Sequence, residues 1–269
     1  SKFTCHRFRR LQPARERGPG NGAVTSLHLK TTPQRVKGVP MTSGDRLGLL
    51  FSYGYAFSLL LIIEAIRRWR NYSPDFTRKI IHIGAGMWIW GILLLFDHWY
   101  LAIIPTATFV LFNAIFLRYH VFNAMDPKEG ATPGTVYFAL SCTLLLAFFH
   151  QGWEQGFPRG LEYYAMAGIM AMTWGDAFSA IIGRRFGKHS YTLFGSKRTI
   201  EGSLAGFIFT LVSVAITLYI LSPLSISLVM IGALVAAIVG TLLEAISPLG
   251  TDNLTVPIGV ALVLFFLGL

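Results

Sequence analysis

Residues 203–246 read SLAGFIFTLVSVAITLYILSPLSISLVMIGALVAAIVGTLLEAI, and they give the clearest indication of the fold class. The stretch contains two apolar runs, 203–222 and 224–246, and its first charged side chain is Glu244. A helix needs about 20 mostly apolar residues to cross a bilayer, so each run is long enough for one span. Backbone polar groups in lipid must bond to one another, which favours helices over open sheet. The stretch therefore predicts two transmembrane helices joined by a short turn.

The chain from Leu47 onward repeats this pattern of apolar runs and short polar connections. The pattern predicts an all-α fold, a polytopic membrane helix bundle with about seven or eight transmembrane helices. The second, fourth and last runs are short for a bilayer, so seven spans with one re-entrant or partial helix is the alternative. The expected spans are 47–66, 80–96, 99–117, 133–149, 161–182, 203–222, 224–246 and 254–269.

The composition supports a membrane protein and excludes other classes. Of 269 residues, 53% are hydrophobic and 13% are charged, and the mean hydropathy is +0.54, which is too apolar for one ordinary soluble core. The net charge is +10, but residues 1–46 carry +8 of it, so no folded basic face remains to bind nucleic acid. Cys5 and Cys142 form neither a CxxC motif nor a Cys/His metal cluster.

The first 45 residues differ from the rest in composition. They are rich in Arg, Gly, Pro and Thr and have no apolar periodicity, so we expect a disordered basic tail at 1–45. This tail is either a transit peptide or upstream sequence, and we expect residues 46–269 to form the transmembrane catalytic domain. A multi-pass protein of this kind would lie in the plasma membrane of a bacterium, or in a plastid or endoplasmic reticulum membrane of a eukaryote.

The distribution of Lys and Arg predicts the orientation of the spans. From Arg67 onward, twelve basic residues fall in the first, third and fifth connections, and only Arg159 falls in the second, fourth and sixth. The odd connections are therefore expected on the cytosolic or stromal side. Arg67 and Arg68 are interpreted as topology determinants only. An interfacial aromatic belt is expected from Trp88, Trp90, Trp99 and Tyr100.

Charged side chains at span ends converge on this cytosolic level. Asp176 lies toward the end of the fifth span, and Glu244 lies at the end of the seventh. Lys79 and His82 are one helical turn apart and share a face of the second helix. Such groups are costly near lipid and therefore indicate function. Further polar residues at this level are Asp126, Lys128, Glu129, Lys197, Arg198, Glu201, Asp252 and Asn253.

These residue types suit phosphate chemistry. Mg²⁺ is typically held by one or two carboxylates together with phosphate oxygens. Basic side chains and helix N-termini bind phosphates, and the sequence GSKRTIEG at 195–202 leads directly into a helix. The pattern therefore predicts phosphoryl or nucleotidyl transfer at the membrane surface. Two other interpretations stay open: the small residues around Asp176 also suit helix packing, and Asp252 or Asn253 could cap the last helix.

Three segments resemble one family. Residues 175–207, GDAFSAIIGRRFGKHSYTLFGSKRTIEGSLAGF, are similar to the signature region of the integral-membrane CTP-dependent lipid kinases. This family includes phytol kinase, dolichol kinase and a CTP-dependent diacylglycerol kinase, and it is distantly related to the phosphatidate cytidylyltransferases. RKIIHIGAG at 78–86 and EAISPLGTDNLTVP at 244–257 resemble the kinase branch.

The resemblance implies a phosphotransferase that moves the γ-phosphate of CTP to the hydroxyl of a long-chain lipid alcohol of the phytol or polyprenol type. Its partners would be CTP, Mg²⁺, the alcohol and the bilayer. By motif position, the implied catalytic residues are Asp176, His82 and Lys79. The residues implied around the nucleotide phosphates are Lys188, Lys197, Arg198, Glu201 and Gly202. The implied metal ligands are Asp176, Asp252 and Glu201, with Asn253 and Glu244 completing the site.

Two alternatives compete with this interpretation. A phosphatidate cytidylyltransferase would use the same nucleotide and release pyrophosphate instead of CDP. An ion-coupled transporter would place its charges near the middle of the spans and show inverted repeats. The charges gather at one face here and no clear internal repeat is present, so the transporter is the weaker alternative.

Overall fold

The computed structural model describes residues 40–125, 132–153 and 160–269. The predicted tail up to residue 39 lies outside the described residues, as do Asp126, Lys128, Glu129 and Arg159. The described helices are α1 (Ser43–Arg70), α2 (Pro74–Leu95), α3 (Trp99–Tyr119), α4 (Gly134–Phe148), α5 (Glu162–Met170), α6 (Ala177–Phe186), α7 (Ile200–Leu221), α8 (Ile226–Ile246) and α9 (Asp252–Leu267).

The all-α membrane bundle is confirmed. Six helical segments in the described residues are long and apolar enough to cross a membrane, and α4 and α9 are shorter apolar helices of 15 and 16 residues. The fourth and last predicted spans are therefore short, as expected. The second predicted span is not short, because α2 has 22 residues and begins at Pro74 instead of 80. The earlier start is stabilised by the Ser73 hydroxyl, which accepts a hydrogen bond from the Phe76 amide.

The predicted boundary of the tail at residue 45 is slightly wrong. Helix α1 begins at Ser43, and Thr42 and Asp45 form a reciprocal capping box. The Asp45 carboxylate is fully buried and also accepts from the His98 backbone amide at 3.1 Å and from His98 Nδ1 at 2.6 Å. This acid therefore anchors the start of α1 to the start of α3 and belongs to the folded part of the chain.

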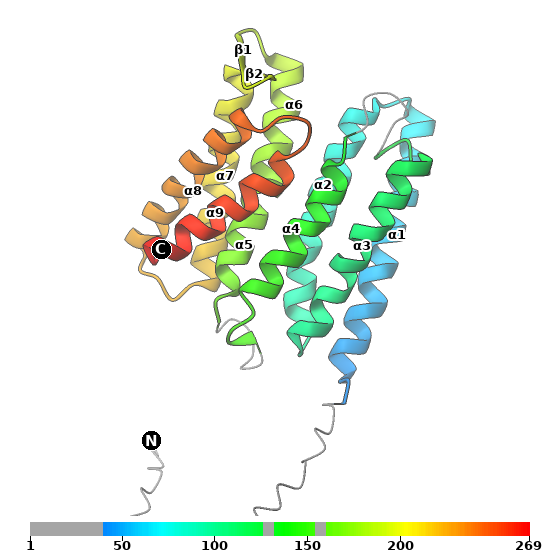
Figure 1. Cartoon of the computed structure of the whole chain (residues 1–269), viewed down its shortest axis with the longest axis vertical. Coiled ribbons are helices and arrows are strands. Elements are labelled where there is room, and N and C mark those ends of the chain that lie inside the picture. The colour runs from blue at the N-terminus through cyan, green and yellow to red at the C-terminus, as the bar shows by residue number, and fades with distance from the viewer. Residues whose placement is uncertain (1–39, 126–131, 154–159) are drawn as a thin grey trace, which may run out of the picture. The chain divides into compact units, whose positions relative to one another are not determined.

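One span forms the centre of the bundle. Helix α5, a π-helical segment at Ala171–Asp176 and α6 follow one another without a break, and 72% of this span is buried, against 17% for α1. In Figure 1, α2, α4, α3 and α1 lie on one side of this span and α7 and α8 on the other, while α9 crosses in front of it and also contacts α4. The span therefore carries Asp176 into the interior.

Small residues let α7 approach the central span closely. A Cβ atom on Gly175 would lie 2.1 Å from Thr210 Oγ1, and one on Gly202 would lie 3.0 Å from the Gly183 Cα. Helices in lipid gain little from the hydrophobic effect, so close van der Waals packing of this kind holds them together. The interpretation of these small residues as packing residues is therefore correct for this interface.

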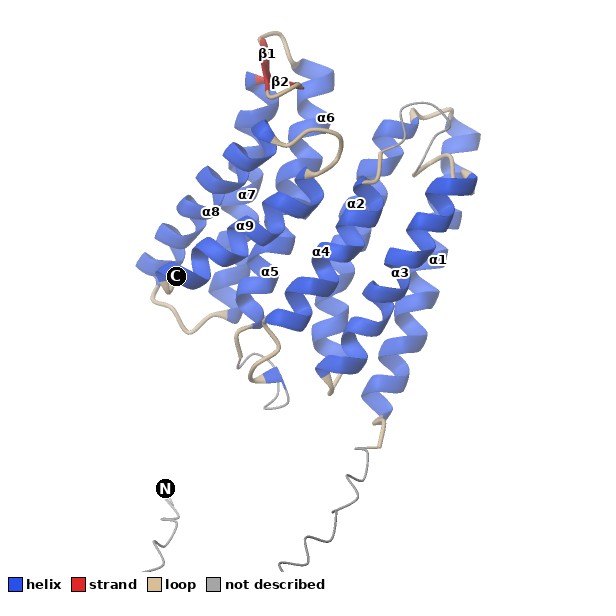
Figure 2. Cartoon of the chain, in the orientation of Figure 1, coloured by secondary structure: helices blue, strands red, loops and turns tan. Residues whose placement is uncertain are grey.

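A short antiparallel hairpin joins α6 to α7. Strands β1 (Ser190–Leu193) and β2 (Ser196–Thr199) pair with Tyr191 opposite Arg198, and Figure 2 shows them at the same end of the bundle as the α8–α9 connection. The two-residue loop has φ of 47° at Phe194 and 80° at Gly195, as a type I′ turn requires. The hairpin fixes Arg198 over that end of the bundle.

Candidate active site

Asp176 forms an ion pair deep in the described bundle. Its Oδ2 lies 2.6 Å from Lys79 Nζ and 3.7 Å from His82 Nε2, and its side chain is 3% exposed. The acid ends the π-helical segment, whereas Lys79 and His82 occupy adjacent turns of one face of α2. The predicted catalytic trio is therefore brought together from two spans.

His82 is held in one orientation. Its Nε2 lies 3.0 Å from the Met172 carbonyl oxygen, which can only accept, so Nε2 carries the hydrogen. In the neutral ring Nδ1 is then the atom with a free lone pair. Gly86 permits this approach of α2 to the π-helical segment, because a Cβ at that position would lie 2.0 Å from Thr173 Oγ1. The ring also packs edge-on against Phe138, with 4.7 Å between ring centroids.

Arg198 connects the hairpin to the ends of α8 and α9. Its guanidinium lies 2.9 Å from Asp252 Oδ2 and 3.1 Å from Glu244 Oε1, and Glu244 also accepts from the Ser179 hydroxyl at 3.0 Å. Burial alone would lower the pKa of Arg198, but the carboxylates of Glu244 and Asp252 outweigh burial and raise the pKa. The guanidinium is therefore charged at neutral pH.

Asn253 presents an unpaired oxygen. Its backbone amide and its side-chain Nδ2 both donate to Asp252 Oδ1, at 2.9 and 3.2 Å, whereas its Oδ1 is buried and has no hydrogen-bond partner among the described residues. Thr251 holds the N-cap position of α9 without a side-chain cap bond. Asp252 therefore satisfies a first-turn amide of α9 with its Oδ1, as a capping residue does, and pairs with Arg198 through its Oδ2, so its side chain serves the helix start and the ionic cluster at once.

The oxygen donors fit a divalent cation. Asp252 and the unpaired Asn253 Oδ1 are neighbouring oxygen donors at the cavity described below, and Asp176, which does not line that cavity, interacts electrostatically with Asp252. No group of three His, Cys, Asp or Glu side chains in the described residues is arranged to hold a metal by itself. Mg²⁺ commonly takes only one or two carboxylates and completes its shell with phosphate oxygens and water, so this donor set fits Mg²⁺ bound together with a nucleotide.

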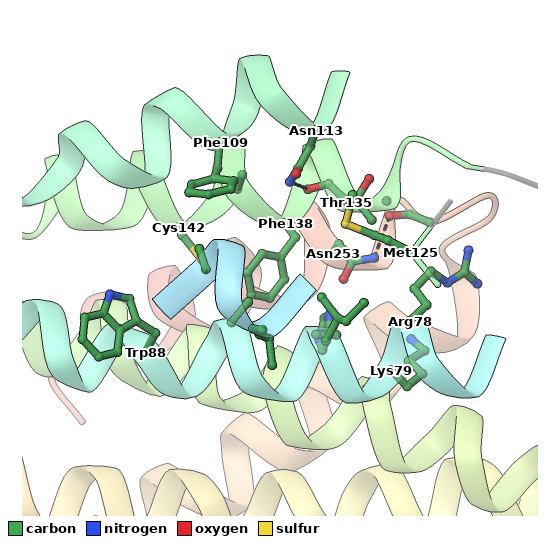
Figure 3. A pocket seen from close by; sticks show the side chains of 18 of the residues that line it. Arg78, Lys79, Trp88, Phe109, Asn113, Met125, Thr135, Phe138, Cys142 and Asn253 are labelled. Atoms are coloured by element: carbon green, nitrogen blue, oxygen red, sulfur yellow. Dashed lines mark hydrogen bonds between the residues drawn. The ribbon is translucent and has the colours of Figure 1, made fainter. Parts of the chain in front are cut away.

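A cavity of about 320 Å³ opens from this charged cluster into the bundle. Figure 3 shows Arg78 and Lys79 at one end, Trp88 at the other, and Phe109, Phe138 and Cys142 between them. The polar end is lined by Arg78, Lys79, His82, Arg184, Arg198, Asp252 and Asn253. One continuous space therefore joins the ionic cluster to an apolar interior.

Four of the predicted phosphate-binding residues lie apart from this cluster. Lys188 and Lys197 are exposed on the hairpin segment and do not line the cavity. Glu201 pairs with the exposed His189 at 2.7 Å instead of approaching Asp176. The Gly202 amide donates to the Thr199 hydroxyl at 3.1 Å, and this glycine packs against α6. Of the GSKRTIEG residues predicted to bind phosphate, the structure thus brings only Arg198 into the cavity.

Two arginines at the cavity mouth were not predicted as site residues. Arg78 and Arg184 both line the polar end, and both contact Asp75, at 3.4 and 2.8 Å. In the sequence they resembled ordinary topology determinants. Arg78 could have been predicted from its position next to Lys79 in the RKIIH segment. Arg184 could not, because its place at the cavity follows from the packing of α6 against α2.

Two further sequence interpretations require correction. Arg67 and Arg68 do more than set topology, because they bond to the buried Glu64 carboxylate at 2.8 and 2.7 Å. Trp88 is not part of an interfacial belt, because it lines the cavity, and Trp90 donates to the Met170 sulfur inside the bundle. Both tryptophans lie inside the second span, which is too deep for an interfacial belt.

Comparison with known proteins places the chain in a family. The Cytidylyltransferase family matches residues 46–251. The phytol kinase of Synechocystis sp. is 34% identical over 214 residues, which cover 78% of this chain and 86% of that protein. Probable phytol kinase 2, chloroplastic, of Glycine max is 25% identical over 262 residues, or 93% and 82% of the two chains. Probable phytol kinase, chloroplastic, of Triticum aestivum is 26% identical over 231 residues, which cover 79% of this chain and 74% of that protein.

No solved structure matches the chain. The family match includes the helices that carry Lys79, His82, Asp176 and Glu244, together with the hairpin that carries Arg198. The predicted kinship with membrane CTP-dependent lipid kinases is thereby confirmed at the level of the family, since the matching relatives bear phytol kinase names. The chain belongs to the Cytidylyltransferase family.

Proposed function

We propose that the protein is a CTP-dependent, Mg²⁺-requiring kinase that phosphorylates the hydroxyl of a long-chain lipid alcohol of the phytol or polyprenol type. The observation that carries this proposal is a continuous cavity with ionic side chains at one end and apolar side chains at the other. A phosphorylated nucleotide and a lipid alcohol need such a junction in order to meet. The phytol kinase names of the relatives support the choice of acceptor.

The transfer requires positioning and charge neutralisation more than covalent chemistry. The alcohol oxygen forms a bond to the γ-phosphorus, the bond from that phosphorus to the bridging oxygen breaks, and CDP leaves with the electron pair. The hydroxyl proton passes to Nδ1 of His82, the ring atom that the Met172 hydrogen bond leaves unprotonated. Lys79 and Arg198 face the same cavity and neutralise the phosphate oxygens.

We assign the cation to Asp176, Asp252 and Asn253 Oδ1. Mg²⁺ held there would withdraw charge from the nucleotide phosphates. Glu244 does not face the cavity, and its role is to hold Arg198 in position. Arg78 and Arg184 at the mouth are proposed to contact the nucleotide, and the exposed Lys188 and Lys197 to attract it from solution. Glu201 and Gly202 would support the hairpin that carries Arg198.

The membrane in which the enzyme works is also a proposal. Several relatives are named chloroplastic, and the basic, acid-poor residues 1–39 suit a plastid transit peptide. A plastid membrane is therefore our first assignment for a eukaryotic source and the plasma membrane for a bacterial one, with the endoplasmic reticulum as the eukaryotic alternative. In each case the charged end of the bundle would face the compartment that supplies the nucleotide.

Transfer of labelled phosphate tests the proposal directly. Purified protein in lipid vesicles would receive γ-labelled CTP, Mg²⁺ and phytol, with parallel reactions containing ATP, UTP or phosphatidic acid. We expect label in a lipid monophosphate with CTP and phytol. Release of labelled pyrophosphate with phosphatidic acid, without a labelled lipid monophosphate, would identify a cytidylyltransferase instead. An Asp176→Asn variant serves as the inactive reference.

A further inference from the structure

We propose that the apolar part of the cavity binds the hydrocarbon tail of a single-chain alcohol, and that Trp88 limits the chain length that fits. This inference rests on the proposed function, because the tail must belong to the molecule whose hydroxyl reaches His82. It goes beyond that function by assigning the tail a binding site inside the protein instead of the surrounding bilayer. It also assigns a residue to specificity.

The cavity follows one face of α2. His82, Ala85, Ile89 and Ile92 all line it and are spaced by three, four and three residues, as one face of a helix requires. Lys79, at the ionic end, and Trp88, at the other end in Figure 3, are separated by nine residues of α2. At about 1.5 Å per residue this part of the cavity extends for about 14 Å. A tail that lies along this face starts with its hydroxyl beside the proposed base.

Beyond the ionic end most of the cavity lining is apolar, with polar exceptions such as Asn113 and Thr135, and much of it comes from α1, α3 and α4. Leu59 of α1, Phe109 of α3, and Phe138 and Cys142 of α4 all line it. Its volume of about 320 Å³ is at the lower end of the range of small-molecule sites, about 300–1,000 Å³. The size suits one hydrocarbon chain better than the two chains of a glycerolipid. Close-packed helices rarely leave such a space, and a tail would restore the dispersion contacts that an empty one forfeits.

The end of the cavity is fixed by contacts of the Trp88 indole. The ring stacks on Tyr55 with 4.7 Å between centroids, and its Nε1–H donates to the buried Ser52 hydroxyl at 3.0 Å. The Tyr55 hydroxyl in turn donates to the Gly84 carbonyl at 2.9 Å. An aromatic ring held by both stacking and a hydrogen bond resists displacement, so the length of the cavity is set by α1 and α2 together.

The first test shortens the cavity. Ala85→Phe would place a ring between the hydroxyl end and Trp88, whereas Leu94→Phe adds the same ring to a side chain of α2 that is 65% exposed and does not line the cavity. Turnover of phytol and of the shorter geraniol would be measured with CTP. We expect Ala85→Phe to lower kcat/KM for phytol by about tenfold or more, and to leave geraniol and the KM for CTP near wild type. Leu94→Phe should change neither alcohol.

The second test lengthens the cavity and does not depend on the first. Trp88→Leu should favour alcohols longer than phytol. We expect kcat/KM for a longer polyprenol, divided by kcat/KM for phytol, to rise by about tenfold. In the wild type, a phytol analogue with a photoactivatable diazirine at its tail end should crosslink to peptides from 85–92 or 138–142, and excess phytol should suppress this. Crosslinks confined to lipid-exposed residues would overturn the tail site whatever the variants do.

The possible outcomes separate the two proposals. If the wild type phosphorylates phytol but Ala85→Phe affects phytol and geraniol equally, the kinase stands and the tail site is wrong. Equal turnover of diacylglycerol and phytol by the wild type would likewise overturn the single-chain assignment. If the wild type transfers phosphate to no alcohol, the proposed function fails, and the crosslinking pattern then decides separately whether the cavity binds a chain.

Discussion

Lys79 Nζ lies 2.6 Å from Asp176 Oδ2, and this ion pair joins α2 to the π-helical segment of the central span. Both side chains are nearly inaccessible, and the cavity begins at Lys79. The pair has two consequences that can be separated by experiment. It links two spans, and it holds a cation and a carboxylate where the phosphate and Mg²⁺ are proposed to bind.

We predict that Asp176→Asn lowers kcat by about a hundredfold or more, because it removes charge from the proposed metal site. It should also lower the unfolding temperature, since breaking a buried pair leaves an uncompensated charge that costs about 3–5 kcal/mol. The double variant Lys79→Met with Asp176→Leu should recover the unfolding temperature without recovering activity. Thermal unfolding and phosphate transfer measured on the same preparations check this, and full activity in the double variant would show that the pair is only structural.

His82→Gln should lower kcat by about 10²–10⁴-fold while leaving the KM for CTP nearly unchanged. Glutamine can still donate to the Met172 carbonyl but cannot accept a proton as the ring does. His189→Gln is the matched control, because His189 is exposed on the hairpin segment and, among the charged side chains that the structure describes, pairs with Glu201 alone. Equal losses in both variants would contradict a catalytic role for His82.

Chelation of divalent cations should abolish transfer, and added Mg²⁺ should restore it. Asn253→Leu should raise the Mg²⁺ concentration needed for half-maximal activity, because it removes the unpaired Oδ1. Asp97→Asn changes an exposed acid at the opposite end of the bundle and should leave the Mg²⁺ requirement unaltered. A titration of activity against Mg²⁺ for the three proteins checks this prediction. An Asn253→Leu curve that overlays the wild-type curve would remove Asn253 from the metal site.

Arg67→Ala should destabilise the protein without affecting turnover. Glu64 is buried and also accepts from the Ala124 amide at 2.8 Å, so loss of Arg67 weakens a contact between α1 and the segment after α3. We expect a cost of about 1–3 kcal/mol, limited because Arg68 still pairs with Glu64. Arg70→Ala, an exposed arginine of the same helix turn, should be silent. Denaturation midpoints, with activity per folded molecule, would separate these effects.

The fold was predictable to a large extent because span length and apolarity are read directly from the sequence. Even the shortness of α4 and α9 was expected, whereas the start of α2 was missed because a Ser-Pro cap outweighed the polar residues before 80. The grouping of Asp176, Lys79 and His82 at one level was also predictable. The position of a residue along its span, at about 1.5 Å per residue, sets its depth, and depth is the coordinate that a membrane sequence encodes best.

The rest of the site depended on which neighbouring element each helix face meets, and periodicity within one helix does not define that. Glu201 and Gly202 lie in the same motif as Arg198, yet the hairpin register directs only the arginine toward Asp252. Trp88 resembled an interfacial residue until the neighbouring helices were in place. The unpaired oxygen of Asn253 was equally invisible, because a hydrogen-bond inventory requires coordinates.

The π-helical segment at Ala171–Asp176 carries a consequence for how this sequence can change. A π-type turn holds one more residue than an α-helical turn needs, so deleting one residue there would regularise the helix. The later side chains would nearly keep their orientation, because the π-type turn absorbs the extra residue. The residues of the segment itself would shift relative to α2, and they include Met172, whose carbonyl bonds to His82, and Asp176, which pairs with Lys79. Removal of one residue here is thus expected to leave a well-formed span that has lost the alignment of both contacts.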